Sequence, residues 1–96
     1  MKFRELGRTG IKVSEIGFGA WGIGGTKNGA IAYGQTNDRT SKTALRRAYD
    51  LGVTFYDTAD LYGYGHSEAL IGMTLSDVRE KIIIASKVGF TSFDGL

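Results

Sequence analysis

The architecture of this protein is indicated above all by the segment Phe55-Tyr56-Asp57-Thr58-Ala59-Asp60-Leu61-Tyr62-Gly63. It begins with apolar and aromatic residues and ends with two aspartates, a tyrosine and a glycine. This order is typical of a buried strand that delivers polar side chains into a cleft at its carboxyl end. A second run has the same order and delivers a lysine: Lys81-Ile82-Ile83-Ile84-Ala85-Ser86-Lys87-Val88-Gly89. We expect both runs to be strands of one sheet.

The remaining sequence alternates short apolar runs with helical patterns. It predicts, in order, a β-hairpin over 3–6 and 11–13, a strand over 16–21, a long Gly-rich loop over 22–35, a helix from 37 to about 51, a strand over 53–57, a helix over 65–75 and a strand over 82–87. Residues 91–96 carry no clear signal.

The helix boundaries and inner faces can also be predicted. Asn37 or Asp38 is expected to cap the first helix, and Gly52 suits the position just after its end. The residues expected to face inward are Ala44, Leu45, Ala48 and Leu51 on the first helix and Ala69, Leu70 and Met73 on the second.

Alternating strands and helices with short connections predict a parallel sheet built from βαβ units. The strands are nearly continuously apolar, as expected of strands covered on both faces. Three strands and two helices leave two open sheet edges, whereas a closed (β/α)8 barrel typically needs ~250 residues. We therefore interpret residues 1–96 as one α/β unit, a partial (β/α)8 (TIM) barrel of about three βα units with an N-terminal hairpin. Either the chain is the first part of something longer, or copies of it complete one another's sheet.

Composition narrows the class of protein. The 96 residues are 42% hydrophobic and 23% charged, with a formal net charge of +2, which is ordinary for a globular protein. Basic residues are scattered, so nucleic acid is not an expected partner. No apolar run approaches a membrane span or a signal peptide, and cysteine is absent. We expect a cytoplasmic protein with no membrane partner.

A literal G-x-G-x-x-G occurs from Gly17 to Gly22. A Rossmann fingerprint would open a helix at once and place an acidic residue about 20 positions later. Here more glycines follow, and no acid ends a strand at that distance. A loop that lets a ligand approach the backbone fits better, and a purely structural loop is the alternative.

Asp57 and Lys87 both lie at the carboxyl ends of predicted strands, which is the end of a parallel sheet where sites form. A structural ion pair would explain them equally well. Tyr62 favours catalysis, because a nearby ammonium lowers the pKa of a phenol, ordinarily about 10, and a carboxylate holds that ammonium in place. Asp57, Tyr62 and Lys87 together make a plausible general acid for a carbonyl oxygen. Asp60 and Tyr64 compete for these roles, but Asp60 suits a turn and Tyr64 lies further into the loop.

The one histidine, His66, stands at a helix start, where polar contacts are its usual role. A single histidine is weak evidence for metal, so no metal site is expected. Ser67 lacks the histidine base or elbow motif of a nucleophile.

Several segments together resemble the amino-terminal part of the aldo-keto reductases. They match in order and spacing: Arg4-Glu5-Leu6-Gly7 with Gly10, Ile16-Gly17-Phe18-Gly19-Ala20-Trp21, Asp57-Thr58-Ala59-Asp60-Leu61-Tyr62-Gly63, Gly65-His66-Ser67-Glu68 and Ala85-Ser86-Lys87. The resemblance implies a (β/α)8 barrel whose bottom is closed by the hairpin, and NADPH-dependent reduction of small-molecule aldehydes or ketones.

The resemblance also implies roles for individual residues. Tyr62 would be the proton donor, Lys87 would tune it, and Asp57 would pair with Lys87. Gly19, Ala20, Trp21 and Asp57 would lie beside the cofactor. The family's catalytic histidine and most of its cofactor-gripping loops would lie beyond Leu96. The alternative is a truncated, catalytically inactive relative that self-associates or binds a partner through its sheet edges.

Overall fold

A computed structural model describes residues 1–89, except the side chain of Asn28. Its strands are β1 (Phe3–Glu5), β2 (Lys12–Ser14), β3 (Gly17–Gly19), β4 (Phe55–Asp57) and β5 (Ile83–Ala85). Its helices are α1 (Asp38–Asp50) and α2 (His66–Leu75), with 3₁₀ turns η1 (Trp21–Ile23), η2 (Lys27–Gly29) and η3 (Ser76–Lys81). Every predicted element in the described range is present; four of the five strands are shorter than predicted, and β2 has the predicted length but lies one residue later. The predicted long loop contains η1 and η2, and residues 91–96 lie outside the described range.

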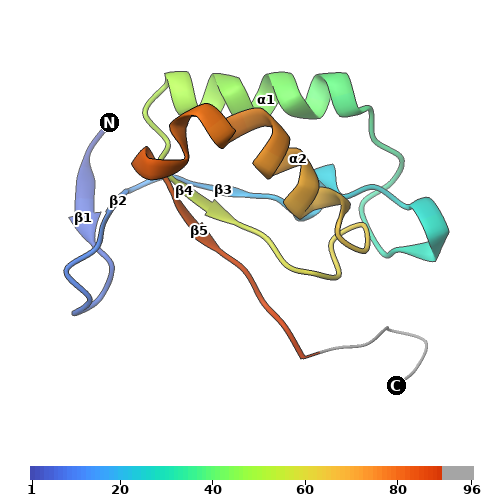
Figure 1. The fold of residues 1–96 in the computed structure, drawn as a ribbon, viewed down its shortest axis with the longest axis horizontal. Helices are drawn as coiled ribbons and strands as arrows, with labels where there is room; N and C mark the ends of the chain where they lie inside the picture. The colour runs from blue at the N-terminus through green and yellow to red at the C-terminus, as the bar shows by residue number, and fades with distance from the viewer. Residues whose placement is uncertain (90–96) are drawn as a thin grey trace.

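The strands form two sheets. β1 and β2 pair antiparallel, while β3, β4 and β5 form a parallel sheet in that order. Figure 1 shows α1 and α2 on the same side of the parallel sheet, with the hairpin at the end where the strands begin. The hairpin is tied to that end by paired hydrogen bonds, from the Ser14 amide to Thr54 Oγ1 (3.0 Å) and from the Thr54 amide to Ser14 Oγ (2.9 Å). This is the βαβαβ arrangement of a partial barrel.

The core lies between the parallel sheet and the two helices. Its fully buried side chains include Tyr56 from the sheet and a set from the helices, namely Leu45, Leu70, Ile71 and Leu75. The other face of the sheet is covered less, since Phe55 and Asp57 on either side of Tyr56 are only half-buried. The prediction of strands covered on both faces is therefore wrong for the part of the chain that the structure describes.

The inner faces of the helices were predicted only in part. Leu45 and Leu70 are buried and Ala48 packs against the core, as expected. Four residues predicted to face inward are instead exposed: Ala44, Leu51, Ala69 and Met73. The reason is the helix phase: α2 buries Ser67, Leu70, Ile71 and Leu75, and Met73 lies about 200° around the helix from Ile71. Leu51 follows the last residue of α1.

The predicted ends of α1 are confirmed. The Asn37 side chain accepts a hydrogen bond from the Thr40 amide (3.1 Å), which satisfies one free donor of the first turn. Gly52 has φ +101° directly after the helix, a conformation that glycine adopts at little cost. No helix within residues 1–89 is long and apolar enough to cross a membrane.

Candidate active site

The carboxyl ends of the three parallel strands lie side by side. Gly19 of β3 is in register with Asp57 of β4, which is in register with Ala85 of β5. Pairing continues past the strand ends, where the Ala20 amide donates to the Asp57 carbonyl (2.8 Å). The Thr58 amide likewise donates to the Ala85 carbonyl (2.8 Å). The polar residues at and after the ends of these strands therefore lie along one edge of the sheet.

The side chains of Lys87 and Asp57 meet at this edge. Lys87 Nζ donates to Asp57 Oδ1 and to the Thr58 carbonyl, both at 2.8 Å. The two side chains are 52% and 47% exposed, so water reaches the pair. The hydrogen bond to Asp57 raises the pKa of Lys87, which keeps the amine protonated.

Tyr62 lies beside the same ammonium. Its position is set by a turn in which the Tyr62 amide donates to the Ala59 carbonyl (3.2 Å). Lys87 Nζ is 5.2 Å from the centre of the Tyr62 ring, within the range of a cation–π interaction. The three residues predicted to act together thus converge, with Asp57 and Tyr62 both contacting Lys87.

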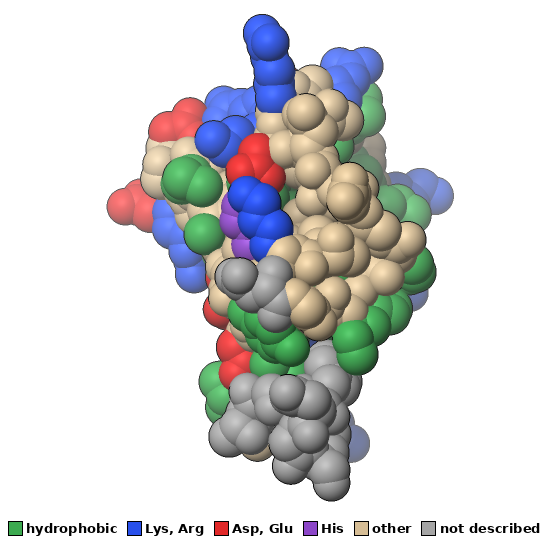
Figure 2. All heavy atoms as spheres, turned by 90° about the vertical axis from the view of Figure 1, so that its right-hand side faces the viewer, with side chains coloured by type: hydrophobic (Ala, Val, Ile, Leu, Met, Phe, Trp, Pro, Cys, Tyr) green, Lys and Arg blue, Asp and Glu red, His purple; other side chains and the backbone are tan. Residues whose placement is uncertain are grey.

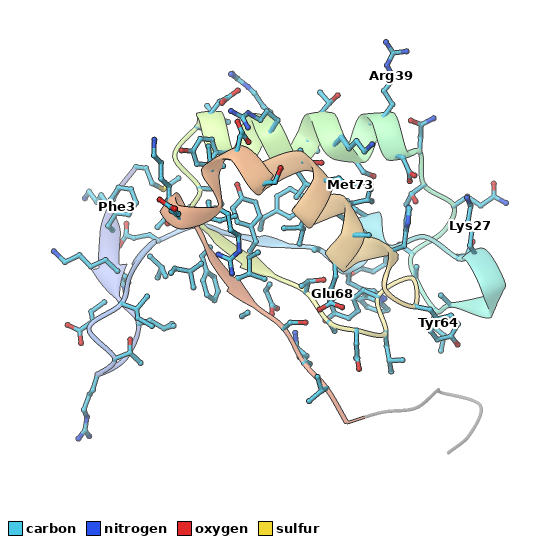
Figure 3. All side chains as sticks on the ribbon, viewed as in Figure 1. Phe3, Lys27, Arg39, Tyr64, Glu68 and Met73 are labelled. Atoms are coloured by element: carbon cyan, nitrogen blue, oxygen red, sulfur yellow. The ribbon has the colours of Figure 1, made fainter. Side chains whose placement is uncertain are left out.

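Asp60 and Tyr64, the alternatives to Asp57 and Tyr62 in the sequence, occupy other positions. Asp60 contributes its main-chain amide, which donates to the Lys87 carbonyl (3.4 Å). Tyr64 is 38% exposed in the following turn, with a left-handed φ of +52°. Figure 3 shows Tyr64 at the opposite end of the molecule from Phe3 of the hairpin.

Gly19, Ala20 and Trp21 run along the same edge. A side chain at Gly19 would meet no atom within 4 Å, so there is open space next to Asp57. Ala20 is fully buried, and its amide and carbonyl both bond within the protein. Trp21 is 37% exposed, and its ring stacks on Tyr62 at 6.3 Å between centroids.

The loop after β3 contributes a residue that the sequence did not single out. Tyr33 packs against Trp21 with 4.8 Å between ring centroids, and Trp21 Nε1 donates to the Ile31 carbonyl (2.8 Å). These two rings and Tyr62 form an aromatic cluster, of which the Tyr62 ring lies beside Lys87. Tyr33 stands in an aperiodic stretch, so no sequence pattern indicated this contact.

The same loop crosses directly over the turn that carries Tyr62. A Cβ built on Gly63 would lie 2.1 Å from the carbonyl oxygen of Gly24, and one on Gly24 would lie 2.8 Å from the Gly63 nitrogen. Only two glycines allow the backbones to approach this closely. At this position the glycines of the loop therefore have a structural role, which is to let two backbone segments of the protein meet.

Ser67 and Thr58 are further residues whose contribution the sequence did not reveal. Thr58 Oγ1 and Ser67 Oγ are 2.8 Å apart, and Ser67 Oγ donates to the Ala20 carbonyl (3.0 Å). The only available signal was the polar run at the start of α2, where Glu68 also accepts a hydrogen bond from Ser86 Oγ (2.6 Å).

His66 makes the polar contact expected at the start of a helix. Its Nε2 lies 2.7 Å from Asp38 Oδ1, which joins the first turns of α2 and α1. The hydrogen bond with His66 lowers the pKa of Asp38. The pair borders a polar hollow of about 540 Å³ that Lys27 also lines, and Figure 2 shows the histidine among acidic and basic side chains on this face.

Comparison with known proteins identifies the family. The model of the aldo/keto reductase family matches residues 15–95. An aldo-keto reductase of Bacillus subtilis is 39% identical over 89 residues, covering 91% of this chain and 25% of the relative. A probable aldo-keto reductase of Glycine max is 42% identical, covering 92% of this chain and 24% of the relative.

Comparison with solved structures indicates the same family. The holo form of an aldo-keto reductase from Bacillus halodurans superposes with a TM-score of 0.77 at 36% identity, over 93% of this chain and 26% of that one. An aldo-keto reductase from Klebsiella pneumoniae in complex with NADPH gives a TM-score of 0.64 at 30% identity, over 80% of this chain and 24% of that one.

The chain therefore belongs to the aldo/keto reductase family, and its fold is part of that family's TIM barrel. It spans about a quarter of the length of the relatives it matches. The predicted family and fold class are confirmed, and the Rossmann interpretation of Gly17 to Gly22 is excluded.

Proposed function

We propose that this chain supplies Asp57, Tyr62 and Lys87 to the active site of an NADPH-dependent oxidoreductase that reduces the carbonyl group of small aldehydes or ketones. The observation that carries the proposal is the position of the Lys87 ammonium, 2.8 Å from the Asp57 carboxylate and 5.2 Å from the centre of the Tyr62 ring. Family membership supports it.

Each residue has a distinct role in the proposal. The Tyr62 hydroxyl donates its proton to the substrate's carbonyl oxygen as negative charge develops there. The Lys87 ammonium stabilises the phenolate that remains. Asp57 holds the ammonium at this position, and the Thr58 carbonyl accepts a second hydrogen bond from it. Bound NADPH would supply the hydride that reduces the carbonyl carbon.

The edge of the sheet fits the nicotinamide end of such a cofactor. Gly19 leaves open space next to Asp57, and the exposed part of Trp21 provides a flat apolar wall. Ala20 is buried, so in the proposal it holds Gly19 and Trp21 in place and does not touch the cofactor itself. The family neighbour solved with NADPH makes this cofactor the preferred candidate.

The proposed activity also requires partners for the sheet edges. Within residues 1–89, β3 and β5 each pair on one side only. A hollow of about 190 Å³ beside β5 is lined by Ile71 and Leu75 of α2 and by Ile84. In the proposal these surfaces are covered by the further strands and helices of a barrel, from a longer chain or from an associating one.

The test of the reaction is consumption of NADPH with a generic aldehyde, in a preparation in which the sheet edges are covered and the wild type has a measurable rate. Replacement of the proton donor in Tyr62→Phe should lower the rate about 100-fold or more, because a positioned general acid contributes that much. Tyr64→Phe, which removes a nearby exposed hydroxyl, is the matched control and should retain the rate. Equal rates for wild type and Tyr62→Phe would remove Tyr62 from its proposed role.

Cofactor binding can be measured without turnover. Trp21 is the only tryptophan, so NADPH bound beside it should quench the tryptophan fluorescence. A Cβ at position 19 meets no atom within 4 Å, so Gly19→Val places a side chain in the open space, and it should weaken this quenching while the fold is retained. Unchanged NADPH binding by Gly19→Val would contradict the proposed cofactor position.

A further inference from the structure

Ser67 is buried where the start of α2 meets the segment after β3, which carries Trp21, and the segment after β4, which carries Tyr62. It has no exposed surface, and neither of its two hydroxyl partners, Thr58 and Ala20, is more than 1% exposed. Thr58 follows β4 and Ala20 follows β3, whereas Ser67 belongs to the first turn of α2. One hydroxyl on a helix thus joins the ends of two strands.

The direction of these hydrogen bonds follows from their chemistry. A carbonyl oxygen can only accept, so the single hydroxyl proton of Ser67 is donated to Ala20 at 3.0 Å. The Thr58 hydroxyl must then be the donor across the 2.8 Å contact with Ser67 Oγ. The chain of bonds runs one way, from Thr58 through Ser67 to Ala20, where the carbonyl also accepts from the Ile23 amide at 3.3 Å.

Each end of this series of hydrogen bonds lies next to the candidate active site. The Thr58 carbonyl accepts a hydrogen bond from Lys87 Nζ at 2.8 Å. Ala20 immediately precedes Trp21, whose ring stacks on Tyr62. The Ser67 amide donates to the Tyr62 carbonyl at 3.1 Å, so the same residue also holds the turn that carries the phenol.

We propose that Ser67 is a positioning residue for the site, fixing Lys87 through Thr58, Trp21 through Ala20, and Tyr62 through its own amide. This proposal rests on the function proposed above for Tyr62 and Lys87. A buried, fully bonded network is rigid, and removal of its central member leaves the Thr58 hydroxyl buried without this partner.

Three variants test the proposal. Ser67→Ala removes the central hydroxyl. Thr58→Val removes the donor at one end with little change of shape and leaves the bond from Ser67 to Ala20. Ser76→Ala removes an exposed hydroxyl at the start of η3 and is the control. If Ser67→Ala does not fold, Ser67→Cys replaces it, because a thiol is a weak donor of similar size.

Amide hydrogen exchange and the fluorescence of Trp21 are the measurements. In Ser67→Ala, protection of the Ala20 and Ile23 amides should fall about tenfold relative to that of Leu51, the residue that follows α1. The emission of Trp21 should shift at the same time. Thr58→Val should show a smaller effect at both positions, and Ser76→Ala none.

The outcomes separate this proposal from the proposed reaction. A uniform loss of protection that includes Leu51, or no loss in Ser67→Ala, would overturn the positioning role. In an active preparation Ser67→Ala should lower kcat more than it changes KM. If Tyr62→Phe keeps full activity, the reaction mechanism fails, while the exchange result still decides whether Ser67 orders the segments around Trp21.

Discussion

The contact between Gly63 and Gly24 makes the most specific prediction about stability. In Gly63→Ala the new Cβ lies 2.1 Å from the Gly24 carbonyl oxygen and 2.9 Å from His66 Cβ. The first of these is a backbone atom, so relief requires movement of the loop that precedes α1 or of the turn that carries Tyr62. The variant should therefore disturb the site as well as destabilise the fold.

The expected loss of stability has two parts. Gly63 has φ +66°, and an L-residue in this left-handed region costs about 1–2 kcal/mol. Forcing extra volume into a packed position typically costs about 1–3 kcal/mol more. We expect Gly63→Ala to lower the free energy of unfolding by about 2–5 kcal/mol.

The matched control is Gly7→Ala in the hairpin. Gly7 has a similar φ of +58°, but a Cβ there meets no atom within 4 Å, so only the conformational part of the cost applies. Urea unfolding followed by circular dichroism measures both variants, with an unchanged slope required for the comparison. If Gly63→Ala loses no more stability than Gly7→Ala, the two backbones do not meet as described.

Three further predictions concern the core, the helix cap and the response to pH. Leu70→Ala should lower the free energy of unfolding by about 2–5 kcal/mol, since Leu70 is fully buried, and Asn37→Ala by about 1 kcal/mol through loss of the cap, both measured by urea unfolding. Burial raises the pKa of Tyr56 to about 12, so the folded state retains this proton after the unfolded state begins to lose it near pH 10. Stability should therefore decrease as pH rises through this range, by up to about 2–3 kcal/mol from Tyr56 alone. Tyr56→Phe should show a flatter decline between about pH 9 and about pH 12. The raised pKa of Lys87 also lowers stability as pH rises, and it does so equally in the wild type and in Tyr56→Phe. An identical decline of stability in the two proteins would therefore contradict the effect of burial on Tyr56.

The sequence predicted that Asp57 and Lys87 meet at one edge of the sheet, because the signals for their positions are local. Asp57 and Lys87 each follow an apolar run, and parallel pairing brings the ends of adjacent strands to one edge. The caps of α1 were equally accessible, because Asn37 and Gly52 act through their own backbone conformations.

The contacts that were missed depend on packing between distant segments. Tyr33 meets Trp21 because the loop after β3 folds back on itself, and Gly24 meets Gly63 because the same loop crosses the turn that carries Tyr62. The phase of α2 was misjudged because apolar residues occur around the whole helix, so Met73 and Ile71 are equally plausible inward residues from the sequence alone. The sheet and α1 decide between them by burying Ile71.

Main-chain hydrogen bonds bring the segments that carry Asp57 and Lys87 next to each other. The amides of Ala20, Thr58 and Asp60 each donate to the neighbouring strand or its extension, so the strand ends are fixed relative to one another by residues of this chain. The Lys87 side chain then bonds both the carboxylate of Asp57 and the carbonyl of Thr58, which lie one residue apart. Two acceptors fix the direction of the ammonium better than one ion pair between half-exposed side chains would, because such pairs contribute little by themselves. The Thr58 carbonyl is therefore as important to the orientation of Lys87 as the charge of Asp57, and it is the point at which the buried Ser67 network reaches the site.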